Sequence, residues 1–187
     1  MTDTFHSPQA DSAAAGTRLK QAITPLIAQH PEHSGVYPLS EGLDAFAARY
    51  QLITLAEKTL DIQYYIWQND LSGRLLFSAL LAAAERGVKV RLLLDDNNTL
   101  GLDRTLSQLN RHPLIEVRLF NPFTFRTLRA LGYLTDFARL NRRMHNKSFT
   151  VDNAATIVGG RNVGDEYFGV GDEPLFSDLD VLAIGPV

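Results

Sequence analysis

Residues 60–94 read LDIQYYIWQNDLSGRLLFSALLAAAERGVKVRLLL, and this stretch decides the fold class. Residues 60–67 alternate as a strand does, and residues 74–86 repeat apolar positions at helical spacing before Gly87. Residues 88–94 form an almost continuous apolar run, which is typical of a strand covered on both faces. Strand, helix and strand at this spacing predict two parallel strands joined by a crossover helix.

The same rhythm extends to both sides of this unit. Residues 1–35 are expected to be a leader, disordered at first and then partly helical, and residues 36–187 to form one domain. The remaining predicted elements are helices at 18–29, 40–53, 102–110 and 163–168 and strands at 114–120, 144–151, 155–158 and 176–184. This order predicts the α/β class, with a mixed but mainly parallel sheet flanked by helices on both faces.

Composition excludes several classes of protein. The 187 residues include 18 basic and 21 acidic ones, and the net charge of −3 opposes a protein held on nucleic acid by bulk charge alone. The absence of cysteine excludes disulfides, zinc-thiolate sites and a cysteine nucleophile. No apolar run approaches the roughly 18 residues of a membrane span, and the amino-terminal residues lack the pattern of a secretory signal.

Residues 145–162, HNKSFTVDNAATIVGGRN, carry the candidate chemistry. His145 and Lys147 stand two apart on a predicted strand, so their side chains face the same side. An imidazole is a nucleophile near neutral pH that needs neither thiol nor metal, and an ammonium group neutralises charge that develops on phosphate oxygens. The pair therefore predicts a site that holds and attacks a phosphate.

Three further residues of this stretch complete the prediction. Asp152, at the turn between two strands, is expected to brace the hairpin or its lysine. The backbone amides around Gly160 can approach an anion closely, because glycine has no side chain. Asn162 is expected to add a side-chain donor at the start of a helix, where the helix dipole favours negative charge.

The full spacing, H-x-K-x4-D-x6-G-G-x-N, resembles the signature of the phospholipase D superfamily, in which the residue after the first glycine is commonly Ser rather than Gly160. Residues 60–67, 95–98 and 142–147 look like the amino-terminal half of bacterial cardiolipin synthases, most closely the C type, and the likeness covers residues 35–187. It implies a phospholipase D-like domain that needs no cofactor or metal. It also implies that two such motifs, from one longer chain or two copies, build one active site.

The resemblance extends to the last predicted strand. In the family, an aspartate seven residues before a Gly-Pro pair orients the catalytic histidine, and Asp178 stands seven residues before Gly185. The resemblance thus implies catalytic roles for His145, Lys147, Asp152 and Asp178, and phosphate binding by Lys147, Gly160 and Asn162. Asp180 is expected to be an ordinary carboxylate in water on an edge strand.

The function that the resemblance implies is a phosphatidyltransferase of cardiolipin synthase type, acting through a phospho-histidine on a phospholipid such as phosphatidylglycerol. It implies a peripheral enzyme at the cytoplasmic face of the inner membrane. Two alternatives stay open: a phosphodiesterase or nuclease formed by two copies, and an isolated half-enzyme without activity. The net charge and the mixed apolar and basic connection at 121–143 argue against a nucleic-acid partner.

Three features keep two interpretations each. The connection at 121–143 places arginines beside large apolar residues, which suits either an anionic membrane surface or packing on a second half. Asp95 and Asp96 follow a predicted strand and form either a polar turn, which we favour, or a metal site. Tyr65 and Trp67 either line a substrate cleft or belong to the core.

Overall fold

The computed structural model describes residues 16–123, 136–171 and 178–185. In chain order the elements are α1 (Arg18–Ala28), β1 (Gly35–Leu39), α2 (Gly42–Leu55), β2 (Thr59–Tyr64), α3 (Leu71–Glu85), β3 (Lys89–Asp95), a 3₁₀ turn (Asp96–Asn98), α4 (Asp103–Leu109), β4 (Ile115–Phe120), α6 (Phe137–Leu140), β5 (Ser148–Val151), β6 (Ala155–Gly159), α7 (Asp165–Phe168) and β7 (Asp180–Ile184).

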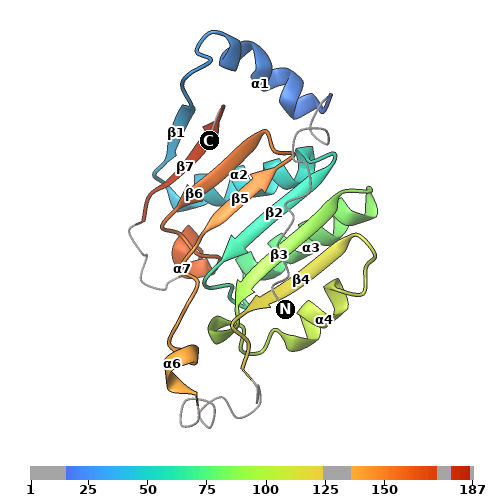
Figure 1. Cartoon of the computed structure of the whole chain (residues 1–187), viewed down its shortest axis with the longest axis vertical. Helices are drawn as coiled ribbons and strands as arrows, with labels where there is room; N and C mark the ends of the chain where they lie inside the picture. The colour runs from blue at the N-terminus through green and yellow to red at the C-terminus, as the bar shows by residue number, and fades with distance from the viewer. Residues whose placement is uncertain (1–15, 124–135, 172–177, 186–187) are drawn as a thin grey trace, which may run out of the picture.

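The strands form one seven-stranded sheet in the order β1-β7-β6-β5-β2-β3-β4 (Figure 1). Two neighbouring pairs are parallel, β2 with β3 and β3 with β4, because α3 and α4 serve as crossovers between these strands. Every other neighbouring pair is antiparallel. The prediction of a mainly parallel sheet is therefore wrong: the sheet is mixed and mostly antiparallel.

The hairpin of β5 and β6 accounts for part of this difference. Its strands are joined by a tight turn in which Asp152 and Asn153 have φ angles of 51° and 48°, a left-handed conformation that Asp and Asn tolerate. So short a connection leaves no room for a crossover, and the two strands must run antiparallel. β5 then pairs with β2 and runs in the opposite direction to it, so the hairpin adds antiparallel strands to the parallel unit of β2, β3 and β4.

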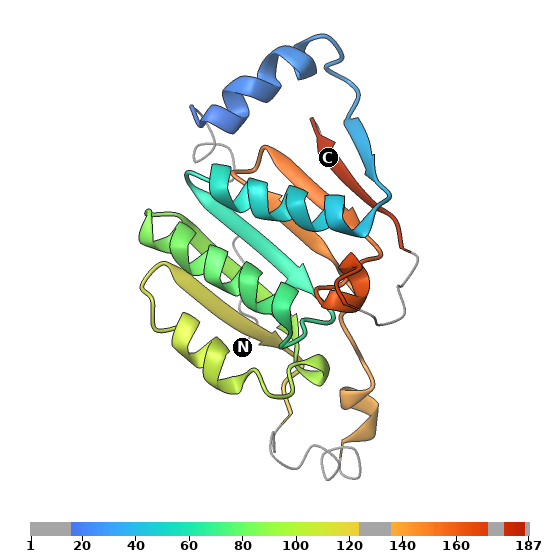
Figure 2. The ribbon, with the colours of Figure 1, turned by 180° about the vertical axis from the view of Figure 1, so that it is seen from behind.

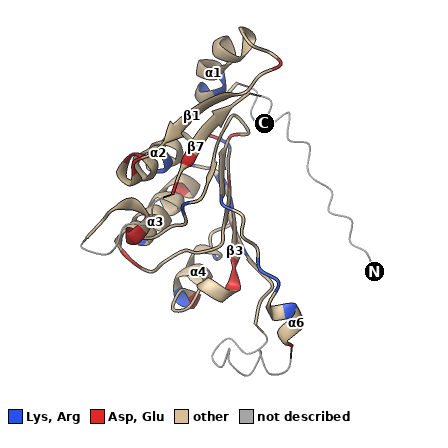
Figure 3. Ribbon diagram, turned by 90° about the vertical axis from the view of Figure 1, so that its left-hand side faces the viewer, with Lys and Arg blue, Asp and Glu red and all other residues tan. Residues whose placement is uncertain are grey.

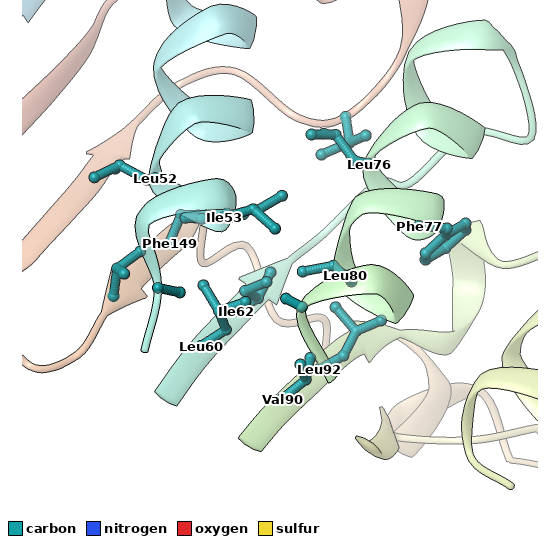
Figure 4. Close-up of a cluster of buried hydrophobic side chains, with 14 of the residues drawn as sticks. Leu52, Ile53, Leu60, Ile62, Leu76, Phe77, Leu80, Val90, Leu92 and Phe149 are labelled. Atoms are coloured by element: carbon teal, nitrogen blue, oxygen red, sulfur yellow. The ribbon is translucent and has the colours of Figure 1, made fainter. Parts of the chain in front are cut away.

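The described helices α2, α3, α4 and α7 lie on the same face of the sheet (Figures 2 and 3). Side chains of β2 and β3 such as Leu60, Ile62 and Leu92 point into this layer and pack with α2 and α3 (Figure 4). On the opposite face of β2 and β3, Asp61 is half-buried and Arg91 exposed, and the two form an ion pair. Within the described residues, these four helices thus cover one face of the sheet, and α6 lies to its other side (Figure 3).

The range predicted as a leader contains ordered structure. α1 is capped by the Thr17 hydroxyl, which accepts from the Lys20 N–H, and Ile23 of this helix is buried. β1 starts at Gly35 and pairs with β7 along its whole length. None of the described helices combines the length and the apolar character that crossing a membrane requires.

Candidate active site

His145 and Lys147 lie directly before β5, which starts at Ser148 rather than at residue 144 as predicted. The Nζ atom of Lys147 is 3.1 Å from Nδ1 of His145 and donates to the His145 carbonyl at 3.0 Å. The structure thus brings together the two side chains that the spacing places on one side. His145 is exposed and Lys147 is half-buried, so an outside group can reach both.

Partial burial lowers the pKa of Lys147, and the nearby carboxylates of Asp178 and Asp180 only partly oppose this effect. The ammonium therefore loses its proton at a lower pH than an ordinary lysine. A bound phosphate would add negative charge next to Nζ and favour the ammonium form, so the site suits an anion close to Nζ.

Tyr65 completes the surroundings of the pair. Its ring centroid lies 4.7 Å from that of His145, and Lys147 Nζ lies 5.7 Å from the same ring. An aromatic face favours a nearby cation, so Tyr65 favours the ammonium form of Lys147. Trp67 instead belongs to the core, where it is buried, stacks on Phe77 and donates from its indole to the Gly73 carbonyl.

The turn after β6 lies against the residues that lead into β7. The Gly160 N–H donates to the Leu179 carbonyl at 3.0 Å, and a Cβ atom at Gly160 would collide with Oδ1 of Asp178. A side chain at 160 would therefore require the Asp178 carboxylate to move. Asp178 precedes β7 by two residues, and among the described residues no hydrogen bond joins it to His145.

Asn162 is buried, and its Oδ1 accepts from the Ile66 N–H at 3.0 Å. It ties the Gly160 turn to the end of β2, beside Tyr65. Helix α7 begins at Asp165, so Asn162 is not at a helix start as predicted. The side chain fixes the loops around the site.

Asp152 lies at the opposite end of β5 from His145. Its carboxylate is buried and accepts from three backbone N–H groups, those of Glu57, Lys58 and Thr59, at 2.8–3.0 Å. Of the two roles predicted for it, bracing the hairpin is the one that these contacts support. Among the described residues it contacts neither His145 nor Lys147, and its place among the catalytic residues stays a prediction.

The sequence analysis missed a buried ionic cluster behind the site. Asp180 is fully buried, accepts from Arg49 Nη2 at 2.8 Å and from the Arg161 N–H at 3.1 Å, and lies 3.7 Å from Arg161 Nη1. Arg49 also donates to the Tyr64 hydroxyl at 2.8 Å. The expectation that Asp180 is in water is therefore wrong. A signal was present, because Arg49 shares a helical face with the apolar Ala45, Leu52 and Ile53.

Arg49 keeps its charge despite burial. Burial lowers the pKa of Arg49, but the Tyr64 hydroxyl and the Asp180 carboxylate together raise it by more. Burial raises the pKa of Tyr64, so its phenol stays neutral and accepts the hydrogen bond from Arg49. The ion pair of Arg49 and Asp180 thus supports the Gly160 turn, because Asp180 accepts from the N–H of the next residue, Arg161.

Asp95 and Asp96 form the predicted polar turn at the end of β3. The carboxylate of Asp95 accepts from Asn97 N–H, Arg143 Nη1 and Met144 N–H. The carboxylate of Asp96 accepts from Phe123 N–H and the Thr99 hydroxyl. These bonds leave the oxygens little capacity to bind a metal ion. Across 16–123, 136–171 and 178–185, no three potential ligands among His, Asp and Glu side chains cluster.

Comparison with known proteins identifies the family. Residues 50–178, more than half of the chain, match the family model described as cardiolipin synthase, phospholipase D-like domain. The chain belongs to this family. It is 73% identical over 170 residues to cardiolipin synthase C of Escherichia coli K12, an alignment that covers 91% of this chain and 36% of that protein. The chain thus spans about a third of the length of the curated relatives it matches.

Solved structures confirm the fold. A phospholipase D family member, nuc from Salmonella typhimurium, matches with a TM-score of 0.54 at 18% identity, covering 82% of this chain and 84% of that one. Phosphatidylserine synthase from Haemophilus influenzae Rd KW20 matches with a TM-score of 0.60 at 15% identity, covering 80% of this chain and 33% of that one. The phospholipase D-like α/β fold expected from the sequence is therefore confirmed.

Proposed function

We propose that this domain supplies one half of the active site of a phosphatidyltransferase of cardiolipin synthase type, with His145 as the nucleophile. The exposed imidazole of His145, 3.1 Å from the ammonium of Lys147, is the observation that carries the proposal. Similarity to cardiolipin synthase C and the match to the family model support the phosphatidyl group as the one transferred.

The resting contact suggests how the reaction starts. In the tautomer of His145 that carries its proton on Nε2, Nδ1 accepts from Lys147, and neither ring nitrogen has a free lone pair for attack. A phosphate that binds the ammonium draws Lys147 away and frees the lone pair of Nδ1. The ring proton can then move to Nδ1, which leaves Nε2 free to attack.

In the first step, the imidazole nitrogen forms a bond to phosphorus while the bond from phosphorus to the headgroup oxygen breaks. The departing alkoxide takes a proton from an acid that the second motif supplies. In the second step, an alcohol such as the glycerol of phosphatidylglycerol gives up its proton and forms a P–O bond, and the P–N bond breaks. Lys147 neutralises oxygen charge in both steps, and water in place of the alcohol gives hydrolysis.

The site needs a partner surface. One His-Lys pair supplies a nucleophile but no separate acid, and His145 faces outward. We therefore propose a second motif that faces it, from a longer chain of the kind that the relatives represent or from a second copy. A substrate within a lipid bilayer further places the enzyme at the membrane surface, which we propose is the cytoplasmic face of the inner membrane.

A phosphodiesterase formed by two copies of this chain is the second candidate. It is favoured by the fold match that covers 84% of the Salmonella typhimurium protein, a chain not much longer than the matched domain. The net charge of −3 argues against nucleic acid as its substrate.

The test is transfer between phosphatidylglycerol molecules in vesicles, measured as cardiolipin and glycerol formed, over a range of concentrations of this chain and in a two-motif version. His145→Ala should reduce turnover by several orders of magnitude. Alkaline quenching should trap label from ³²P-labelled substrate on His145 in the unsubstituted protein, because a P–N bond to histidine is stable in base and labile in acid. His33→Ala, at an exposed histidine in the loop before β1, is the matched control and should keep full activity. Undiminished transfer by the His145 variant would refute the proposal.

A further inference from the structure

The 3₁₀ turn after β3 holds the segment that leads to His145. Asp95 and Asp96, its two acidic residues, are both fully buried. Neighbouring buried carboxylates are costly unless each is well paired, so their partners show what the turn is for.

The partners of Asp95 are the two residues directly before His145. Oδ1 of Asp95 accepts from Arg143 Nη1 at 3.0 Å, and Oδ2 accepts from the Met144 N–H at 2.9 Å. The Nη2 atom of Arg143 is buried and has no hydrogen-bond partner, which makes Asp95 the ion-pair partner that fixes this guanidinium within the described residues. Charge-assisted bonds of this kind are among the stronger ones in proteins.

The partners of Asp96 lie elsewhere. Oδ2 of Asp96 accepts from the Phe123 N–H at 2.7 Å, and Oδ1 accepts from the Thr99 hydroxyl at 2.7 Å. The two carboxylates therefore hold different ends of the connection between β4 and β5. Asp96 holds the end that leaves the sheet, whereas Asp95 holds the end that returns to it.

His145 depends on this anchor because residues 142–147 are outside any strand. On its carboxyl side the backbone is fixed by β5. On its amino side it is fixed by Asp95 through Arg143 and Met144, and Asn121 Nδ2 adds a bond to the Arg142 carbonyl at 2.8 Å. The same turn also reaches the aromatic neighbour of His145, because Asn98 Nδ2 donates to the Tyr65 carbonyl at 3.2 Å. One short turn thus contacts both the segment that carries the His145 imidazole and the backbone of Tyr65, whose ring lies against that imidazole.

We infer that Asp95 is a positioning residue that orients His145 through the Arg143 guanidinium and the Met144 backbone. The inference rests on the role proposed for His145 but concerns only where its ring is held. Loss of the Asp95 charge leaves the guanidinium of Arg143 buried and unpaired, so the segment before His145 moves and the imidazole loses its alignment with Lys147.

The experiment compares two adjacent, equally buried carboxylates in the 187-residue chain. Asp95→Asn and Asp96→Asn each keep the side-chain shape and remove one buried charge, so both should lower thermal stability. The imidazole signals of His145 are followed by ¹⁵N-resolved NMR, and binding of inorganic phosphate is measured by titration. Asp95→Asn should change the His145 ring signals and weaken phosphate binding by about 10-fold, as expected when a reacting group is misplaced. Asp96→Asn should change both readouts clearly less, because its partner Phe123 reaches Arg143 only by a ring contact, 5.1 Å from the guanidinium carbon to the ring centroid.

Ring signals and phosphate affinity that respond equally to the two substitutions, or to neither, would overturn the inference. If Asp95→Asn fails to fold, Arg143→Gln keeps the bond from Met144 to Asp95 and should still shift the His145 signals, and unchanged signals would overturn it as well. Failure of the proposed function has a different signature, since His145→Ala would then keep transfer activity even though Asp95→Asn displaces the ring.

Discussion

Replacing Asp180 by Asn tests whether the buried ion pair behind the site holds the domain together. The substitution keeps the shape of the side chain and removes a negative charge that lies 2.8 Å from Arg49 and 3.7 Å from Arg161. Both guanidiniums are buried, so water cannot replace the interactions with the carboxylate that they lose. The variant therefore leaves two cations without the carboxylate that they share.

The size of the effect follows from burial. Breaking a buried pair by removing one partner costs about 3–5 kcal/mol. In a chain of this length, each kcal/mol shifts the unfolding temperature by about 2–4 °C, so a decrease of about 10 °C is expected. Asp61→Asn is the matched control, because its partner Arg91 is 53% exposed, and it should cost less than about 1 kcal/mol.

Urea and thermal unfolding of both variants measure the difference, and the double variant Arg49→Met/Asp180→Asn measures the coupling between the pair. If the two charges stabilise each other, the double variant should lose clearly less than the sum of the two single losses. A free energy of unfolding for Asp180→Asn within about 1 kcal/mol of that for Asp61→Asn would show that the reasoning about this cluster is wrong.

Three further outcomes are expected. Phosphate binding should weaken as pH rises through the lowered pKa of Lys147, below the ordinary value of 10.5, since the ammonium form makes the contact; Lys147→Arg should remove this alkaline limb in the same titration, because arginine stays charged. Asp152→Ala should cost about 2–4 kcal/mol in urea unfolding, because it leaves backbone donors at 57–59 without their acceptor. Transfer activity of a two-motif version should be unchanged by a chelator, because Lys147 supplies the positive charge; a loss that one added metal ion reverses would contradict this.

The sequence predicts those parts of the fold that depend on neighbouring residues. Alternation at 60–67, helical spacing at 74–86 and the apolar run at 88–94 correspond to β2, α3 and β3. Strand neighbours are a different matter, because periodicity shows which face of a strand is buried but not which strand lies beside it. The antiparallel contact of β2 with β5 joins segments about 90 residues apart, and no local rule predicts it.

The same limit explains what was found and missed in the site. His145 and Lys147 are two residues apart, so local geometry alone brings their side chains together. Asp178 and Asp180 are two residues apart in the sequence, and Asp180 was expected in water, yet it is buried and paired with Arg49, which is 131 residues away. The face that α2 presents to the sheet decides which of the two aspartates enters the core. Tertiary packing sets that face, so the sequence pattern alone does not predict it.

The H-x-K-x4-D spacing itself combines chemistry with architecture. His145 and Asp152 are seven residues apart along an extended chain, a span of about 20 Å, so one side chain cannot serve the other directly. Asp152 instead fixes the register of β5 through the N–H groups of 57–59, at the start of β2. A slip of one residue in that register would turn Lys147 to the opposite side of the chain and away from the phosphate site. We therefore propose that the aspartate acts on the candidate site through the direction in which Lys147 points.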